Sequence, residues 1–351
     1  MKTRWLQSTL LTCLTLALMM MWVPNLQAAP KSKVTIEMGS SKIGSIGYVL
    51  IHATTELINK NSPWLRATFV ETTGITENLK ILSEEPARRK SFAHYAEVFT
   101  QQQAALGDRP FNRPYKTNKI IARMATMLTA IVTLDPKIKT VKDLIGKRVS
   151  VGPKGISIYW HAYRILHDGY GIWDKIKPEY LGFTQGKNAL INGLIDASIQ
   201  GSSIKKAGES PYKPKVVGLA PAGRELKDRK KPYIVSYDKA DIDKARKKSG
   251  YPLYWVEIPA GTWGPNQPNP VGGELSNMTW SCDIEMPEEV VYEITRILYE
   301  HSGKFKDYHV VGRSISQAEM ANVPGTEADF HPGAVKFYKE HRIKIGAPVL
   351  Q

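Results

Sequence analysis

The sequence has few cysteines: Cys13 and Cys282 are the only two in 351 residues. Cys13 lies in an N-terminal segment that we expect to be removed, so the mature chain is predicted to contain one thiol and no internal disulfide. An exported protein without a disulfide must be stabilised by its hydrophobic core. The roughly 320 remaining residues suffice to bury one, most simply in two domains. After the N-terminal segment, no apolar run reaches the ~20 residues of a membrane-spanning helix.

The sequence also lacks the patterns of common catalytic sites. No histidine pair has the His-Glu-x-x-His spacing of a zinc site. His161 and His167 are six residues apart on one expected helix and would point in different directions. Residues 44–47 lack the spacing of a nucleophile elbow, and no dinucleotide fingerprint is present. Cys282 lies on an expected crossing strand, where a structural thiol is commoner than a nucleophile. We therefore expect no enzyme, cofactor or metal site, with a secreted α/β enzyme acting on a small anionic substrate as the alternative.

The first 28 residues have the features of a secretory signal peptide. Lys2 and Arg4 form a basic start, residues 5–23 are almost free of charge, and small residues near Ala28 provide a cleavage site. We therefore expect export to the periplasm and cleavage near Ala28. Loss of Lys2 and Arg4 lowers the formal net charge from +15 to +13. In an exported protein this basic charge favours small anions or a solvated face, and nucleic acid is not an expected partner.

A strand, a glycine-containing turn and a helix follow one another three times along the chain. This repetition predicts a parallel α/β sheet, in which ligands bind at the carboxyl ends of the strands. Glycine lets the backbone approach a ligand closely, and the first N–H groups of a helix form an anion site. The expected strands are 34–38, 67–70 and 148–151, the helices after them end near Asn61 or span 75–82 and 156–167, and Thr140 and Asp143 have capping-box spacing.

Two further β-prone runs, residues 123–133 and 277–284, predict strands that cross between two lobes. The second run precedes a helix expected over 288–301. On this interpretation the first lobe combines residues 29–126 with 277–351, and the second lobe comprises residues 127–276.

Five segments of the chain stand out together. They are Gly44–Tyr48 with Ala53–Asn59, Glu71–Leu82, Gly146–Pro153, Ile258–Thr262, and His331–Ala334 with Phe337–Glu340. Each segment alone is unspecific, but in this order they span nearly the whole mature chain. The series resembles the TAXI family, the extracytoplasmic solute receptors of tripartite ATP-independent periplasmic (TRAP) transporters. The resemblance implies a two-lobed type II periplasmic binding protein that closes on a small organic carboxylate and delivers it to a separate membrane permease driven by an ion gradient.

The resemblance also implies a ligand site between the lobes. Backbone N–H groups at helix starts would hold the carboxylate, and Asn78 and Ser41 would add side-chain donors. Where the family usually has small or hydroxyl residues, this chain has Ile46, Ile75 and Ile156. These isoleucines either lie outside the pocket or favour a larger carboxylate with an apolar or aromatic body. The expected ligand-binding residues are Ser41, Lys42, Gly44, Ser45, Tyr48, Ile75, Thr76, Asn78, Lys154, Gly155, Ile156, Ser157, Tyr159, Trp160, Ser202 and Trp263.

A basic stretch occupies residues 205–250, which contain 14 Lys or Arg and 6 Asp or Glu. Such an excess is typical of a solvated helix-and-loop surface. It is also a candidate contact for the permease.

Overall fold

The computed structural model describes residues 31–43, 45–206 and 212–346. The predicted signal peptide and its cleavage site near Ala28 lie outside the described residues, as does Gly44. Contacts divide the chain into the units Met1–Lys33 and Val34–Gln351, and every described helix and strand lies in the second. Within the described ranges, no helix is both long and apolar enough to cross a membrane.

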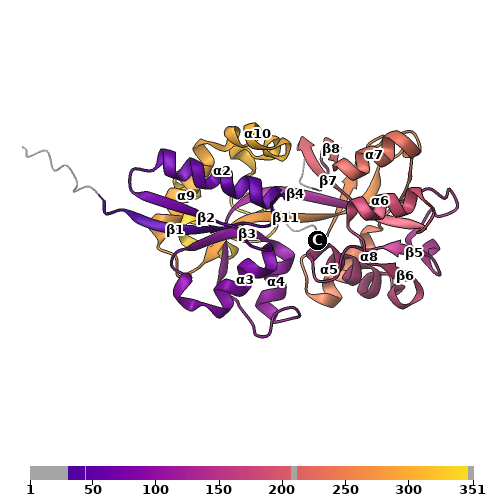
Figure 1. The fold of residues 1–351 in the computed structure, drawn as a ribbon, viewed down its shortest axis with the longest axis horizontal. Helices are drawn as coiled ribbons and strands as arrows, with labels where there is room; N and C mark the ends of the chain where they lie inside the picture. The colour runs from indigo at the N-terminus through magenta and orange to yellow at the C-terminus, as the bar shows by residue number, and fades with distance from the viewer. Residues whose placement is uncertain (1–30, 44, 207–211, 347–351) are drawn as a thin grey trace, which may run out of the picture. The chain divides into compact units, whose positions relative to one another are not determined.

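The described chain forms one mixed sheet of eleven strands, drawn as arrows in Figure 1. The strands are β1 (Val34–Gly39), β2 (Leu65–Val70), β3 (Phe92–Glu97), β4 (Asn118–Thr133), β5 (Arg148–Ser150), β6 (Lys177–Glu179), β7 (Ala197–Lys206), β8 (Val216–Leu219), β9 (Tyr233–Val235), β10 (Tyr254–Ile258) and β11 (Val271–Asp283). Their order is β2-β1-β3-β11-β4-β7-β5-β6, with β8, β9 and β10 beside β7, β4 and β11. The predicted parallel pairing is confirmed for β1 with β2 and β3, and for β5 with β6 and β7. It is wrong in the middle, where β3, β11, β4 and β7 pair antiparallel.

The helices begin and end close to their predicted positions. The helix expected over 156–167 is the exception, because it ends at Arg164 and continues as a π-helical turn over Ile165–Gly169. The predicted capping box is present, since Thr140 N donates to Asp143 Oδ2 over 2.8 Å. The helices are α2 (Ile46–Asn61), α3 (Ile75–Glu84), α4 (Val98–Leu106), α5 (Ser157–Arg164), α6 (Phe183–Ile191), α7 (Pro221–Lys230), α8 (Lys239–Ser249), α9 (Glu288–Glu300), α10 (Phe305–Tyr308) and α11 (Pro332–Glu340).

Two long antiparallel strands, β4 and β11, connect two lobes. They pair with each other along most of their length (Figure 1). Residues of β4 up to Ala125 pack in one hydrophobic core with β1 and α2, whereas residues from Leu128 onward pack in separate clusters with elements between β5 and β10. The two-lobed α/β architecture with two crossing strands is therefore confirmed. The lobe boundaries at 126/127 and 276/277 stay predictions.

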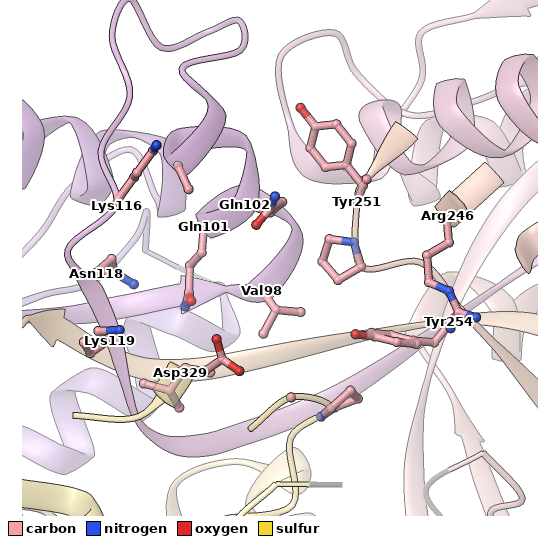
Figure 2. Close-up of a pocket in the computed structure, with 16 residues that line it drawn as sticks. Val98, Gln101, Gln102, Lys116, Asn118, Lys119, Arg246, Tyr251, Tyr254 and Asp329 are labelled. Carbon is pink, nitrogen blue, oxygen red and sulfur yellow. The ribbon is translucent and has the colours of Figure 1, made fainter. Parts of the chain in front are cut away.

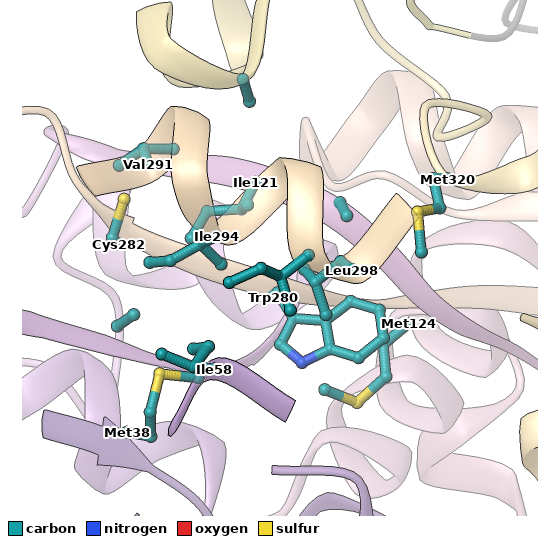
Figure 3. Close-up of a cluster of buried hydrophobic side chains, with 14 of the residues drawn as sticks. Met38, Ile58, Ile121, Met124, Trp280, Cys282, Val291, Ile294, Leu298 and Met320 are labelled. Atoms are coloured by element: carbon teal, nitrogen blue, oxygen red, sulfur yellow. The ribbon is translucent and has the colours of Figure 1, made fainter. Parts of the chain in front are cut away.

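The core of the first lobe forms around Trp280, a side chain of β11 that is 1% exposed. Figure 3 shows its indole among side chains of α9 and β4, including Leu298 and Met124. The indole N–H donates to Thr54 Oγ1 of α2 over 3.0 Å, so one residue joins β11 to α2. Cys282 belongs to the same core, and burial raises the pKa of its thiol well above the usual range. A thiol that stays protonated in an apolar core has a structural role.

Candidate functional site

The carboxyl ends of three neighbouring parallel strands, β2, β1 and β3, lie side by side in the first lobe. Hydrogen bonds join the loops that follow β1 and β2. The Ser40 hydroxyl donates to Val70 O over 2.9 Å, and the Thr72 hydroxyl lies 2.8 Å from Ser40 O. Gly74 N, at the start of α3, donates to Thr72 Oγ1 over 3.1 Å. The loops before α2 and α3 are therefore held in one arrangement, at the place where the sequence predicts a ligand site.

Asn78 holds these loops together from inside the protein. Its side chain is fully buried, and Nδ2 donates to Ser40 O and Tyr95 O over 2.9 Å each. Its Oδ1 lies 2.9 Å from the Thr72 hydroxyl. Both amide N–H groups thus have protein partners, so the expectation that Asn78 donates to a ligand is wrong in this arrangement. Asn78 instead fixes the ends of β1 and β3.

The start of α2 explains why this loop is rich in serine and glycine. Ser45 caps the helix by accepting a hydrogen bond from Tyr48 N over 3.1 Å, and the hydroxyls of Ser41 and Ser45 are hydrogen-bonded to each other. A Cβ on Gly47 would lie 2.5 Å from the Tyr95 ring, so only glycine lets α2 pack this closely on β3. Lys42 is exposed in the same loop.

Three predicted residues of the first lobe are only half-buried, and two of them have packing partners in the protein. Tyr48 packs edge-to-face on Phe69 with ring centroids 4.9 Å apart. Ile75 packs against two hydrophobic clusters, one with β1 and α2 and one with α3 and α4, and Ile46 packs against the first of these. Thr76 is half-buried beside Ile75. Ile46 and Ile75 therefore contribute to the core.

The loop after β5 carries the predicted residues of the second lobe. Gly152 and Gly155 have φ angles of +92° and +87°, a region that favours glycine. Lys154, Gly155 and Ile156 are exposed, and Ile156 is 48% exposed. Of the three isoleucines, Ile156 is thus the one that offers apolar surface. Ile156 directly precedes α5, whose first turn at Ser157 has no side-chain cap and therefore leaves backbone N–H groups available.

Aromatic side chains pack together beside this loop. Tyr159 and Trp160 are half-buried on α5, with ring centroids 4.9 Å apart, and both also contact Tyr163. The Lys154 ammonium lies 4.1 Å from the centroid of the Tyr180 ring, which is 5.9 Å from Tyr159. The cluster presents rings and one cation next to the uncapped start of α5.

Two predicted ligand contacts in the second lobe, Ser202 and Trp263, have fully buried side chains, and their role in binding stays a prediction. The Ser202 hydroxyl, on β7, donates to Leu128 O of β4 over 3.4 Å. Trp263 is 0% exposed in a cluster with Leu226 and Ile258. Both residues pack in the interior of the second lobe.

A buried ionic cluster, which the sequence analysis missed, lies where the lobes meet. His161 of α5 is 2.7 Å from Glu274 of β11 through Nδ1 and 3.4 Å from Glu97 of β3 through Nε2. Burial lowers the pKa of His161, but the charges of Glu274 and Glu97 outweigh it and raise this pKa to about 10. Burial raises the pKa of Glu97, and the opposing charge of His161 and several hydrogen bonds bring it below the usual value. His161 is therefore a cation held between two carboxylates.

Glu97 and Glu274 have further hydrogen-bond donors. Glu97 accepts from Phe99 N and Thr100 N at the start of α4, and from the Ser276 hydroxyl over 2.7 Å. Glu274 accepts from the Thr129 hydroxyl of β4 over 2.9 Å. The donors satisfy oxygens that would otherwise be buried without partners.

Phe99 extends the contact between the lobes. It belongs to α4 of the first lobe, yet it is fully buried in a hydrophobic cluster of the second. Its ring centroid lies 4.1 Å from His161 and 4.4 Å from Tyr251. The Tyr251 hydroxyl donates in turn to Asp108 over 2.5 Å, and Arg164 lies 3.6 Å from Asp108. These contacts hold α4 and the chain after it against α5 and the loop after α8.

The contact joins α5, the helix after the second-lobe loop, to β3, the strand beside β1. Ser157 precedes His161 by four residues, about 6 Å along α5 and on the same face. Glu97 ends β3, the strand beside β1. Among the described residues, no group of three or more His, Cys, Asp or Glu side chains has the arrangement of a metal site. The arrangement therefore offers backbone N–H groups, hydroxyls and lysines to an anion.

Comparisons with known proteins give one family and several weak structural similarities. The model of the NMT1-like family matches residues 38–341. The structure is similar to the periplasmic aliphatic sulphonate binding protein SsuA from Escherichia coli (15% identity, 89% of this chain and 94% of that chain, TM-score 0.47). It is also similar to a TctC solute binding protein from Polaromonas (15%, 80% and 86%, 0.45) and to a periplasmic sulfonate-binding protein SsuA from Methylobacillus flagellatus KT (12%, 90% and 80%, 0.44). Because these TM-scores are below 0.5, we infer neither ligand nor partner from them.

The structural role of Asn78 is testable by substitution. Asn78→Ala removes one donor from each of the buried Ser40 and Tyr95 carbonyls and an acceptor of the Thr72 hydroxyl, so we expect the free energy of unfolding to fall by about 3 kcal/mol. Urea unfolding measures this change. Asn112→Ala, at an exposed position, is the control and should change the free energy by less than about 0.5 kcal/mol. A loss below about 1 kcal/mol in Asn78→Ala would contradict the role.

The raised pKa of His161 predicts a specific dependence of stability on pH. Because the folded protein holds this proton more tightly than the unfolded chain, the contribution is complete below pH 6.5 and is lost as the pH rises toward about 10. The destabilisation caused by His161→Gln should therefore shrink by up to about 1.4 kcal/mol per pH unit between pH 7 and 9. Urea unfolding of both proteins across this range measures the difference. A constant difference would show that His161 is not charged by its carboxylate neighbours.

Proposed function

The chain belongs to the NMT1-like family, and we propose that it is an extracytoplasmic solute-binding receptor that captures a small organic carboxylate between its two lobes. The observation that carries this proposal is the pair of glycine loops at the carboxyl ends of parallel strands, one in each lobe. The predicted signal peptide supports a periplasmic location. The absence of a metal cluster or a catalytic motif in the described part of the chain leaves the loops with binding as their simplest role.

The loops suit a carboxylate because they present donors from both lobes. The uncapped start of α5 at Ser157 has backbone N–H groups that a carboxylate can satisfy, and the helix dipole adds a favourable field. Lys42 and Lys154 are exposed in the two loops and add positive charge. Ile156 and the rings of Tyr159 and Trp160 offer apolar surface beside them, so we propose a carboxylate with an apolar or aromatic body. Each Å² of apolar surface buried there contributes about 25 cal/mol.

We further propose that the lobes close on the ligand by bending of β4 and β11. The contact of Glu97 and Phe99 with His161 and Tyr251 would form in the closed receptor and separate on opening. Separation is feasible because each charge keeps partners on its own side: Glu97 keeps the N–H groups of α4, and His161 keeps Glu274. Opening would expose the Phe99 ring to water, which is unfavourable, so burial of this ring favours the closed form.

A receptor of this kind needs a separate permease, and we propose one of the TRAP type on the basis of the five sequence segments. The basic stretch 205–250 is the candidate contact. Its lysines at 230, 231, 247 and 248 are exposed on or next to α7 and α8. Positive charge at these positions would attract an acidic surface of the permease.

The carboxylate specificity is testable with a panel of glutamate, 2-oxoglutarate and phenylpyruvate. We expect at least one to raise the melting temperature of the mature protein, phenylpyruvate most, and to be recovered chemically unchanged. Ile156→Asp places a negative charge beside α5 and should weaken binding at least tenfold by calorimetry. Leu194→Asp, at a position 61% exposed and outside both loops, should leave binding unchanged.

Conversion of the stabilising compound into a product would instead support the secreted enzyme. Equal binding by Ile156→Asp and the wild type would remove the α5 loop from the site.

Closure is testable at Phe99. Phe99→Ala removes the ring that packs between His161 and Tyr251, so the ligand-free protein should have a larger radius of gyration by small-angle scattering. Ligand affinity should fall roughly tenfold, since part of the binding energy is then used to close the lobes. Phe99→Leu keeps apolar volume, so its radius of gyration and ligand affinity should lie between those of the wild type and Phe99→Ala. An unchanged radius of gyration in Phe99→Ala, with folding verified by circular dichroism, would contradict a closing contact.

A further inference from the structure

A pocket lies beside α4, and none of the predicted ligand-binding residues lines it. Its volume is about 410 Å³, within the range of small-molecule sites. One face of α4, with residues spaced at 98, 101, 102 and 105, forms part of its wall, together with the start of β4. Figure 2 shows Tyr254 and Arg246 of the second lobe facing these elements. The pocket is therefore lined by both lobes. We propose that it binds a small hydroxylated organic anion.

The charges around the pocket favour an anion. Lys116, Lys119 and Arg246 line it against a single acidic side chain, Asp329. Lys119 donates to Ala328 O over 2.6 Å and retains further N–H groups, and Lys116 has no hydrogen-bond or ion-pair partner among the described residues. Figure 2 places both lysines on the first-lobe wall. The two ammonium groups lie apart on this wall, with the Asn118 side chain between them, and each suits an acid group.

The opposite wall favours hydroxyl groups. Tyr254 is 6% exposed, and within the described part of the chain its hydroxyl has no hydrogen-bond partner. Figure 2 shows this hydroxyl pointing into the pocket on the side of Asp329. Burial raises the pKa of Tyr254 to about 12, so the hydroxyl stays a donor. Asp329 uses Oδ2 to accept from Thr326 N over 2.7 Å, which leaves Oδ1 to accept from a ligand hydroxyl.

Gln102 adds an adaptable group to this lining. It lines the pocket from α4, and its amide has no protein partner in the described ranges. An amide offers both a donor and an acceptor, as a hydroxylated chain requires. A buried hydroxyl without a hydrogen-bond partner, such as that of Tyr254, is unfavourable. A ligand that accepts from this hydroxyl removes the penalty and binds more tightly. The lining thus offers ammonium groups to an acid, and a hydroxyl, an amide and a carboxylate oxygen to ligand hydroxyls.

Binding in this pocket has a consequence for the receptor. Tyr251 lines the pocket and also packs on Phe99, the ring that joins the lobes. An anion that contacts both walls would stabilise the closed arrangement and raise the affinity for the transported solute, because coupling between two sites is reciprocal. This consequence rests on the proposed hinge closure. Binding of the anion in this pocket does not depend on hinge closure.

Calorimetry of the mature protein with D-gluconate, D-sorbitol and sulfate tests the proposal. D-Gluconate combines an acid with hydroxyls and should bind at least tenfold more tightly than sorbitol, which has no charge, or sulfate, which has no hydroxyl. The double variant Tyr254→Phe with Lys116→Gln keeps the ring and the side-chain length, and it should weaken gluconate binding at least tenfold. Lys90→Gln, at an exposed position outside the pocket, should not.

Three results would overturn the proposal: no binding of gluconate, binding unchanged in the double variant, or sulfate binding as tightly as gluconate. Ile156→Asp distinguishes the two sites. Gluconate binding that is lost in Ile156→Asp but kept in the double variant would assign gluconate to the strand-end loops, which refutes the second site and leaves the proposed receptor function intact. Urea unfolding of each variant verifies that it is folded.

Discussion

The arrangement of the lobes depends on one buried contact, the one in which His161 lies between Glu97 and Glu274. A charge without a partner in such a position would be strongly unfavourable, so the three groups require one another. Their contact fixes the start of α4 against α5, the helix that follows the glycine loop of the second lobe. Phe99 adds the apolar part of the same contact, because its ring fills a space in the core of the other lobe.

The partners of these charges explain how such a contact can be both stable and separable. Glu97 keeps hydrogen bonds from the backbone of α4, and His161 keeps the carboxylate of Glu274, so opening breaks the longer of the two ionic contacts, at 3.4 Å. Opening also breaks the contacts of Tyr251 and Arg164 with Asp108 and exposes the Phe99 ring. A receptor needs a small free-energy difference between its open and closed forms, because a ligand can shift this equilibrium only by its differential affinity for the two forms.

Local patterns in the sequence predict the elements well, because they depend on neighbouring residues. The turn at Gly152, the capping box at Thr140 and the end of α2 lie where the sequence places them. The antiparallel middle of the sheet depends instead on β11 returning between β3 and β4, which no local pattern encodes. Burial by tertiary packing is likewise not encoded locally. The sequence therefore places Asn78, Ser202 and Trp263 in a binding site, whereas all three are buried in the structure. The pairing of Glu97 with His161 joins residues 64 positions apart, and its only signal is an acid inside the apolar run 92–99.

The central claim is that the loops of both lobes hold one carboxylate. A crystal structure of the mature protein with its tightest-binding carboxylate tests it most directly. The account predicts carboxylate oxygens within hydrogen-bond distance of backbone N–H groups both in the loop of Ser41 to Ser45 and at the start of α5, with Phe99 still buried against His161. A ligand bound by only one lobe, or bound away from both loops, would contradict it.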